Sequence, residues 1–394
     1  MAIEKIDGVI SVASNSYDSP TGYGQQVKLL IDRLVKHGVK TANLSNYGLQ
    51  GMKSEIKTPY GKVPHYPMGY KQYSDDVIPV WHNEFSQQFE GKKSAVLTLY
   101  DQWVYNDLKF DGNVIAWTPL DHVTLPPNVL KFLLRHNVTP ITMSPHGQRQ
   151  LEKSGVQSVY IPHAIDTTVM KPTETVFGVP TREYLDVPED AFLVSIVAAN
   201  KANGLVHRKA LAEQLMAFAI FRQTHPDAYL YLHTEPSPVF GGFNIPQLLR
   251  AVGLTEEFVR ILNSDVNRVG YPAEFLAGVM TASDVGLQVS YGEGFGVPAL
   301  EFQACGTRVI VSNWAASPDL AGPDSFLVDG QPFWDEPQAS FYHIPNIGSI
   351  VQALSLAYEA PRGLSKASID FAKDFDADRV FNWYWMPFLR EYFK

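Results

Sequence analysis

The chain has little cysteine and no long apolar run, and each absence restricts what the protein is. Cys305 is the one cysteine among 394 residues, which excludes an internal disulfide and fits a reducing compartment. No apolar stretch approaches the roughly 20 residues that a membrane-spanning helix needs. The start of the chain carries Glu4 and Asp7 before a strand-like run, which is not typical of a signal peptide. We therefore expect a soluble, cytoplasmic protein without a transmembrane segment.

Positive charge is also scarce. The chain has 32 Lys and Arg against 41 Asp and Glu, a net charge of −9, which argues against broad binding to nucleic acid but leaves room for a local basic patch. It contains no repeat, no low-complexity tract and no Cys/His cluster at metal-ligand spacing. With 45% hydrophobic residues and 394 residues in total, the chain can form two globular domains, each with its own core.

The most informative stretch is residues 291–306, which read YGEGFGVPALEFQACG. It follows a short apolar run over residues 285–289, which predicts a buried strand. A glycine-rich loop comes next, and Pro298 suits the first turn of a helix. No Ser, Thr, Asp or Asn stands where this helix needs an N-cap, so its first backbone N–H groups are left for an anion such as a phosphate.

Two glutamates accompany this helix start: Glu293 in the loop and Glu301 about one turn into the helix. A carboxylate accepts two hydrogen bonds in fixed directions, which suits the paired hydroxyls of a sugar or a ribose. Together with the closing Ala-Cys-Gly, this stretch resembles the donor-binding segment of the family 4 GT-B glycosyltransferases, with the pattern E-G-F-G-x-x-x-L-E-A-x-A-C-G. Phe302 stands where alanine is usual, and Gln303 occupies the variable position. The plain alternative is a strand–loop–helix corner with two surface glutamates.

The order of elements agrees with that resemblance. Residues 9–13 predict a strand, a glycine turn and a helix follow it, and residues 39–44 predict the next strand, as in a parallel α/β unit. The resemblance implies the GT-B fold, an α/β architecture of two Rossmann-like domains facing each other across a cleft. We expect an acceptor-side domain over residues 1–173, a donor-binding domain over 174–370, and a C-terminal helix over 371–394 that packs back on the first domain. The proline-rich residues 171–180 are the expected linker.

The resemblance also implies a donor-binding set. Arg208 and Lys209 match the basic pair that holds the donor diphosphate in the family, where a fixed cation stabilises the charge that grows on the leaving nucleotide. The alternative is a solvated basic pair at a helix start, a place that the helix dipole disfavours. The turn with Gly22 and Gly24 is equally compatible with plain helix packing. The full set is Gly22, Gly24, Arg208, Lys209, Tyr271, Glu293, Gly294, Phe295, Gly296, Val297 and Glu301.

Three residues are candidates for a catalytic role: His122, Asp121 and Glu293. His122 resembles the family histidine that lies between donor sugar and acceptor, and Asp121 competes for the same place. The alternative for His122 is a loop histidine bonded to backbone. The family retains the anomeric configuration by front-face attack assisted by the leaving phosphate, so we assign no protein nucleophile.

Asp374, Asp376 and Asp378 form two D-x-D triplets. In glycosyltransferases of the other common fold this triplet holds a metal, but acids at a helix start also cap it and suit its dipole. We therefore expect no metal and no cofactor. The aromatic residues 379–393 resemble a membrane-surface helix, yet the family's last helix packs on the first domain, which is the interpretation we favour.

The sequence thus predicts a retaining glycosyltransferase that moves a sugar from a nucleoside-diphosphate sugar to a hydroxyl acceptor. A nucleotide-sugar epimerase of the same fold and a non-catalytic nucleotide-sugar-binding module remain alternatives. The acceptor stays open among a glycan, a lipid-linked sugar, a protein, a small molecule and a modified nucleic-acid base.

Overall fold

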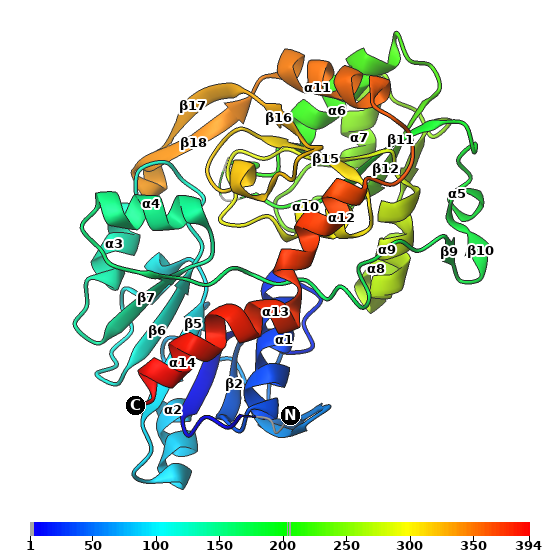
Figure 1. The fold of residues 1–394 in the computed structure, drawn as a ribbon. Coiled ribbons are helices and arrows are strands. Elements are labelled where there is room, and N and C mark those ends of the chain that lie inside the picture. The colour runs from blue at the N-terminus through cyan, green and yellow to red at the C-terminus, as the bar shows by residue number, and fades with distance from the viewer. Residues whose placement is uncertain (1–3, 203, 205) are drawn as a thin grey trace. The chain divides into compact units, whose positions relative to one another are not determined.

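The computed structural model describes residues 4–202, 204 and 206–394. These residues form two compact units, each built on its own sheet (Figure 1). The first unit contains residues up to 164, residues 336–340 and residues 377–394. The second unit contains residues 165–335 and 341–376.

The first unit is an eight-stranded sheet with the strand order β3-β4-β2-β1-β5-β6-β7-β8. All neighbours are parallel except β3 and β4, which form an antiparallel hairpin. All seven residues of β1 are buried, as expected for a parallel strand with both faces covered. The strands are β1 (Val9–Asn15), β2 (Lys40–Tyr47), β3 (Ser54–Thr58), β4 (Gly61–Tyr66), β5 (Ser94–Leu99), β6 (Val114–Thr118), β7 (Val138–Thr142) and β8 (Val159–Tyr160). The helices between them are α1 (Gly22–Lys36), α2 (Ile78–Ser86), α3 (Pro127–Leu133) and α4 (Pro145–Lys153), with the 3-10 turns η1 (Gln87–Phe89) and η2 (Gln102–Tyr105).

The end of the chain packs on this first sheet. It comprises α13 (Ala377–Val380), the π-helical turn η6 (Phe381–Trp385) and α14 (Met386–Tyr392). The Trp385 ring meets the Trp117 ring edge-on with centroids 5.0 Å apart, and Leu389 is fully buried. The prediction that the last helix packs back on the first domain is therefore confirmed. Over the described parts of the chain, no helix combines the length and the apolarity needed to cross a bilayer.

The second unit is a six-stranded, wholly parallel sheet with the order β13-β12-β11-β14-β15-β16. Its strands are β11 (Phe192–Val197), β12 (Ala228–His233), β13 (Val259–Ile261), β14 (Val285–Gln288), β15 (Arg308–Ser312) and β16 (Phe326–Val328). Its helices are α5 (Thr181–Tyr184), α6 (Leu211–Arg222), α7 (Ile245–Ala251), α8 (Ser264–Val269), α9 (Ala273–Ala282), α10 (Val297–Ala304), α11 (Ile347–Glu359) and α12 (Lys366–Ala372), with the 3-10 turns η3 (Ser317–Leu320) and η5 (Lys373–Phe375). The chain also forms the two hairpins β9 (Thr175–Val176) with β10 (Val179–Pro180) and β17 (Gly330–Asp335) with β18 (Ser340–Pro345), the second containing the 3-10 turn η4 (Glu336–Gln338).

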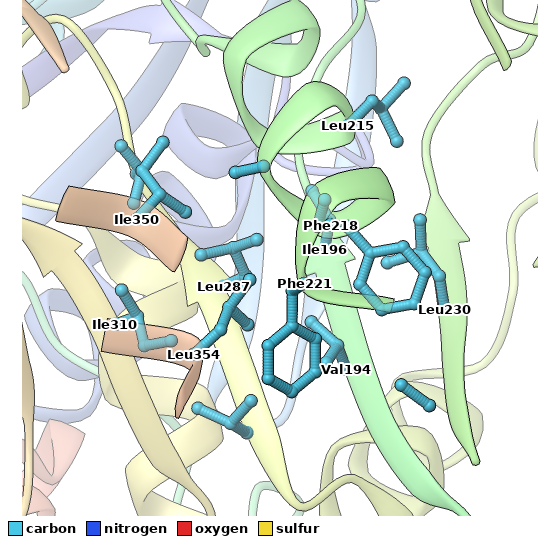
Figure 2. Packing of buried hydrophobic residues seen from close by; sticks show 14 of the residues in the cluster. Val194, Ile196, Leu215, Phe218, Phe221, Leu230, Leu287, Ile310, Ile350 and Leu354 are labelled. Carbon is cyan, nitrogen blue, oxygen red and sulfur yellow. The ribbon is translucent and has the colours of Figure 1, made fainter. Parts of the chain in front are cut away.

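One apolar core holds α6 and α11 against this second sheet. Phe218 and Phe221 of α6 lie beside Val194 of β11, as Figure 2 shows, and all three are at most 1% exposed. Leu354 of α11 belongs to the same cluster. Burying side chains of this size contributes about 2 kcal/mol each, which fixes the helices on the sheet. This packing positions the carboxyl ends of β11 and β14. The residues of the candidate site follow these two strand ends.

Some segments differ from the expected elements. The hairpin β3–β4 was not predicted, because Ile56 is the one buried residue of β3 and the buried residues of β4, Val63, His65 and Tyr66, do not alternate regularly with exposed ones. The proline-rich residues 171–180, expected to be a linker, contain the hairpin β9–β10, and Val176 is buried in a core cluster of the second unit.

Candidate functional site

The candidate site of the second unit is built around the start of α10. Strand β14 ends at Gln288, and the glycine-rich loop leads to Val297, the first residue of the helix. Gly296 is the N-cap, with φ 112°, and no side chain caps the helix. A residue other than glycine would be strained in this left-handed conformation. The predicted strand, loop and uncapped helix are all present, and the helix presents backbone N–H groups and the positive end of its dipole to an anion.

The structure brings Glu293 together with the predicted basic pair. Lys209 Nζ lies 2.7 Å from Glu293 Oε1, and Arg208 Nη1 lies 3.0 Å from Glu293 Oε2. The Arg208 guanidinium also donates to the Gly292 carbonyl, and the Tyr291 N–H donates to the Arg208 carbonyl at 2.7 Å. Two segments about 85 residues apart in sequence are therefore joined by charge-assisted hydrogen bonds.

These three groups are largely withdrawn from water. The exposed fraction is 14% for the Glu293 side chain, 23% for Arg208 and 22% for Lys209. Burial by itself would raise the pKa of Glu293, but the charges and hydrogen bonds of Lys209 and Arg208 outweigh it and hold that pKa at about 2. Burial lowers the pKa of Lys209, and the nearby Arg208 lowers it further while Glu293 opposes the change. Glu293 is thus an ionised carboxylate that serves as the shared counter-ion of two partly buried cations.

Glu301 lies in a different environment. Its side chain is 6% exposed, and the described part of the chain provides no hydrogen bond or ion pair to its carboxylate. Burial raises the pKa of Glu301 to about 7. The pKa of the buried Cys305 thiol is raised to about 12, chiefly by its burial and in second place by the charge of Glu301. A buried carboxylate without a partner is costly unless a ligand supplies donors.

A cavity open to solvent lies between the ends of the strands and α10, and the empty space there, open solvent included, is about 420 Å³. Lys209, Glu293 and Gly296 are among its lining residues. Its wall also contains Gln214 and Ser317, whose Oε1 and Oγ atoms are buried without a hydrogen-bond partner among the residues described. The sequence analysis did not identify these two residues. For Gln214 a signal was present, because it and Glu213 are the two polar residues inside the apolar stretch LAEQLMAFAIF of α6, and Gln214 is the buried one.

Tyr271 and Phe295 complete the predicted set in the second unit. The Tyr271 ring stacks on Phe275 with centroids 4.5 Å apart, and its hydroxyl accepts from the Asn263 N–H at 3.2 Å. Phe295 is 3% exposed, so only its backbone is positioned to meet a ligand. Gly294 and Val297 lie on either side of it in the loop and at the helix start.

The other predicted residues belong to the first unit. His122 is 4% exposed and its Nδ1 lies 2.7 Å from Asp121 Oδ1, so the two competing candidates form one pair. The His146 Nε2 atom lies 2.8 Å from the His122 carbonyl, which holds this loop in place. A Cβ on Gly24 would lie 2.1 Å from the Ser19 carbonyl oxygen, whereas a Cβ on Gly22 would meet open space.

The acidic triplets near the end of the chain are dispersed. Asp376 accepts from Thr167 Oγ1 at 2.5 Å, and Asp378 lies 2.9 Å from Arg33 Nε. Among residues 4–202, 204 and 206–394 no group of three or more His, Cys, Asp or Glu side chains is arranged to hold a metal ion.

Solved structures with the same architecture cover almost the whole chain. Sucrose-phosphate synthase from Thermosynechococcus elongatus matches with a TM-score of 0.73 at 16% identity, over 98% of this chain and 99% of that one. The Anabaena protein HepE, solved in complex with UDP-glucose, matches with a TM-score of 0.65 at 15% identity, over 96% and 99%. These likenesses identify the GT-B fold.

The sequence model of the family "Glycosyl transferases group 1" matches residues 207–338, which include both glutamates and the basic pair. This match covers about a third of the chain and makes that stretch similar to glycosyltransferases of the group. Among curated proteins, a D-inositol 3-phosphate glycosyltransferase of Arthrobacter sp. (strain FB24) is 31% identical over 173 residues, 43% of this chain and 37% of that protein. One of Corynebacterium jeikeium (strain K411) is 44% identical over 61 residues, 15% of each chain. The chain therefore spans well under half the length of these curated relatives.

Proposed function

We propose that the protein transfers a sugar from a nucleoside-diphosphate sugar to a hydroxyl acceptor with retention at the anomeric carbon. The observation that carries this proposal is the Glu301 carboxylate, which is 6% exposed and has no partner in the described part of the chain. It lies about one turn into α10, and no side chain of the described residues caps the N-terminus of that helix. The start of the same helix, at Gly296 and Pro298, lines a cavity that also has Lys209 and Glu293 in its wall. A ribose diphosphate supplies what each feature requires: hydroxyl donors for the carboxylate and an anion for the helix start.

Each predicted residue then has a role on the donor. Arg208, Lys209 and the backbone N–H groups of Phe295 to Val297 would bind the diphosphate, with Gly294 and Gly296 allowing its close approach. Glu301 would accept hydrogen bonds from the ribose hydroxyls. Glu293 would accept from the hydroxyls of the sugar while the diphosphate takes over part of its role as counter-ion. The Tyr271 loop would hold the nucleobase.

The chemistry needs no protein nucleophile. The acceptor oxygen bonds to the anomeric carbon on the face from which the phosphate leaves, and the acceptor proton passes to the departing phosphate oxygen. Arg208 and Lys209 would stabilise the negative charge that develops there, which makes a bound metal unnecessary. His122, held by Asp121 at 2.7 Å, would contact the sugar near the anomeric carbon. Transfer is accordingly expected to continue in EDTA.

UDP-glucose is the first donor to test, because HepE was solved with it. The acceptor is less constrained. The curated relatives are named for D-inositol 3-phosphate, which makes that polyol phosphate one acceptor to include.

The test is thermal stabilisation by UDP-, GDP-, ADP- and TDP-sugars, because a ligand that binds only the folded state raises Tm. We expect one nucleotide sugar to stabilise the wild type and to lose most of that effect with Glu301→Ala and Lys209→Ala. Glu359→Ala and Lys366→Ala, exposed glutamate and lysine variants on α11 and α12, are the matched controls. No shift from any nucleotide sugar at millimolar concentration would overturn the proposal. Binding without transfer would favour a non-catalytic module, and product formation without an acceptor would favour an epimerase.

A further inference from the structure

A row of aromatic rings lies at the carboxyl edge of the first unit's sheet. Tyr23 is in the first turn of α1, Tyr100 directly follows β5, Tyr73 is in the loop between β4 and α2, and Trp103 is in η2. Ring centroids are 5.2 Å apart for Tyr23 and Tyr100, 5.8 Å for Tyr100 and Tyr73, and 5.9 Å for Tyr73 and Trp103. Three separate loops therefore converge on one aromatic platform, at the edge where parallel sheets bind their ligands.

Tyr73, Tyr100 and Trp103 of the platform pack on the first unit's hydrophobic core, but the core does not enclose them. All four rings are only partly buried, and two neighbouring tyrosines on the same edge, Tyr47 and Tyr70, are 51% and 104% exposed. Polar groups accompany the rings: the Tyr100 hydroxyl donates to Asn15 Oδ1, and the Asn15 amide donates to Thr21 Oγ1 at 2.6 Å. Apolar ring faces combined with a few placed hydrogen-bonding groups are the lining that ligand sites use to hold amphipathic molecules.

The charge of this edge is acidic. The segments that follow β1, β2, β4 and β5, residues 16–21, 48–53, 67–77 and 100–105, contain the acids Asp18, Asp75, Asp76 and Asp101. The cations of these segments are Lys53 and Lys71, and both are paired. Lys53 lies 2.6 Å from Glu84, and Lys71 lies 2.8 Å from Asp75. The hydrogen bond and charge of Asp75 raise the pKa of Lys71, and Asp107 and Asp76 add to that effect. An anionic acceptor would meet net repulsion here instead of a binding group.

We infer that the acceptor is an uncharged glycan, one of whose sugar rings stacks on the platform of Tyr100, Tyr73 and Trp103. This inference rests on the proposed transfer function, because it assigns the substrate that receives the sugar. The apolar face of a sugar ring packs on aromatic rings, and its hydroxyls bond to groups such as the Asn15 amide and the tyrosine hydroxyls. A phosphate ester of the same sugar adds a charge near −2 that no unpaired cation of these loops neutralises.

The first experiment compares matched acceptors after a stabilising nucleotide sugar has been found. Neutral mono- and oligosaccharides and inositol are each assayed beside their phosphate esters, with UDP-glucose as the starting donor and product detected by mass spectrometry. We expect neutral glycans to be glycosylated with a kcat/KM at least tenfold above that of the esters. Equal or better use of the phosphate esters would overturn the inference, and so would binding of the donor with no transfer to any neutral glycan.

The second experiment tests the platform itself. Tyr73→Ala and Trp103→Ala should raise the acceptor KM at least tenfold, whereas Tyr73→Phe and Trp103→Phe, which keep a ring, should retain most of the affinity. Trp383→Ala removes a tryptophan that is 55% exposed and outside the platform, and serves as the matched control. The Tm shift caused by the donor should persist in every variant, which separates this inference from the proposed function. If the alanine variants keep the wild-type acceptor KM, the platform is not the acceptor site.

Discussion

At the scale of single residues, Glu301 is the group whose environment conflicts most with its charge. Burial raises the pKa of Glu301 to about 7, above the ordinary value of 4.5. Between these two pH values the carboxyl group is protonated in the folded state and ionised in the unfolded state. Stability contributed by that proton is present at low pH and falls as pH rises from 4.5 to 7. The shift corresponds to about 3 kcal/mol of unfavourable free energy above pH 7.

We therefore predict that Glu301→Gln, which keeps the shape and removes the charge, is more stable than the wild type at pH 8 by up to about 3 kcal/mol. At pH 5 the gain should shrink to below about 1 kcal/mol, because the folded wild type is then protonated. Urea denaturation at the two pH values measures both differences. If the gain in stability is the same at both pH values, Glu301 of the folded protein does not change its protonation state between pH 5 and pH 8.

Glu293 has the opposite role, because it neutralises Arg208 and Lys209. Glu293→Gln leaves two partly buried like charges without a counter-ion. We expect it to cost about 3 kcal/mol, the low end for a broken buried ion pair, because the groups are partly exposed. Inorganic pyrophosphate should then stabilise the variant more than the wild type, since the anion replaces the missing charge. Thermal unfolding with and without pyrophosphate tests this, with Glu359→Gln as the exposed control. An equal response of both proteins would contradict it.

At the scale of elements, the turn into α1 separates two glycines that look alike in sequence. A Cβ on Gly24 would lie 2.1 Å from the Ser19 carbonyl oxygen, whereas one on Gly22 meets nothing within 4 Å. Gly24→Ala should therefore destabilise the protein by about 1–3 kcal/mol through overpacking. Gly22→Ala should be neutral or slightly stabilising, since it lowers the entropy of the unfolded chain. Chemical denaturation compares the two, and an equally destabilised Gly22→Ala would contradict the distinction.

The elements also show what the sequence could predict. The uncapped helix after residue 296 was predictable because a missing N-cap, a proline in the first turn and a glycine loop are local signals. The hairpin of residues 54–66 was not, because β3 has one buried residue, Ile56, and the buried Val63, His65 and Tyr66 of β4 include a polar side chain and follow no regular alternation. The pairing of Glu293 with both cations was also beyond a local argument, since it joins segments about 85 residues apart. The residue types were enough to predict the donor candidates. Only the fold shows that Glu293 pairs with Arg208 and Lys209 whereas Glu301 is buried away from them.

At the scale of the whole molecule, the end of the chain returns to the unit that contains its beginning. Trp385 is 2% exposed and packs edge-on against Trp117, and Leu389 is fully buried in the same unit. The first unit is therefore completed only when the last 18 residues have been added, after the second unit's sequence. A loss of packing in this C-terminal segment should act on the first sheet, because the second sheet has a separate core around Phe218 and Phe221.

We predict that Trp385→Ala destabilises the first unit by about 3–5 kcal/mol, the usual cost of a large cavity in a packed core. Hydrogen exchange followed by mass spectrometry should then show faster exchange in the strands over residues 9–15, 94–99 and 114–118, while residues 192–197 and 285–288 keep their protection. The exposed Trp383→Ala is the control for removal of an indole ring. The Tm increment produced by a nucleotide sugar should survive, since its proposed contacts at Arg208, Lys209 and Glu301 belong to the other unit. Equal acceleration of exchange in both sheets would instead mean that the two cores unfold as one cooperative body, and the stability of the donor site would then depend on the C-terminal helix.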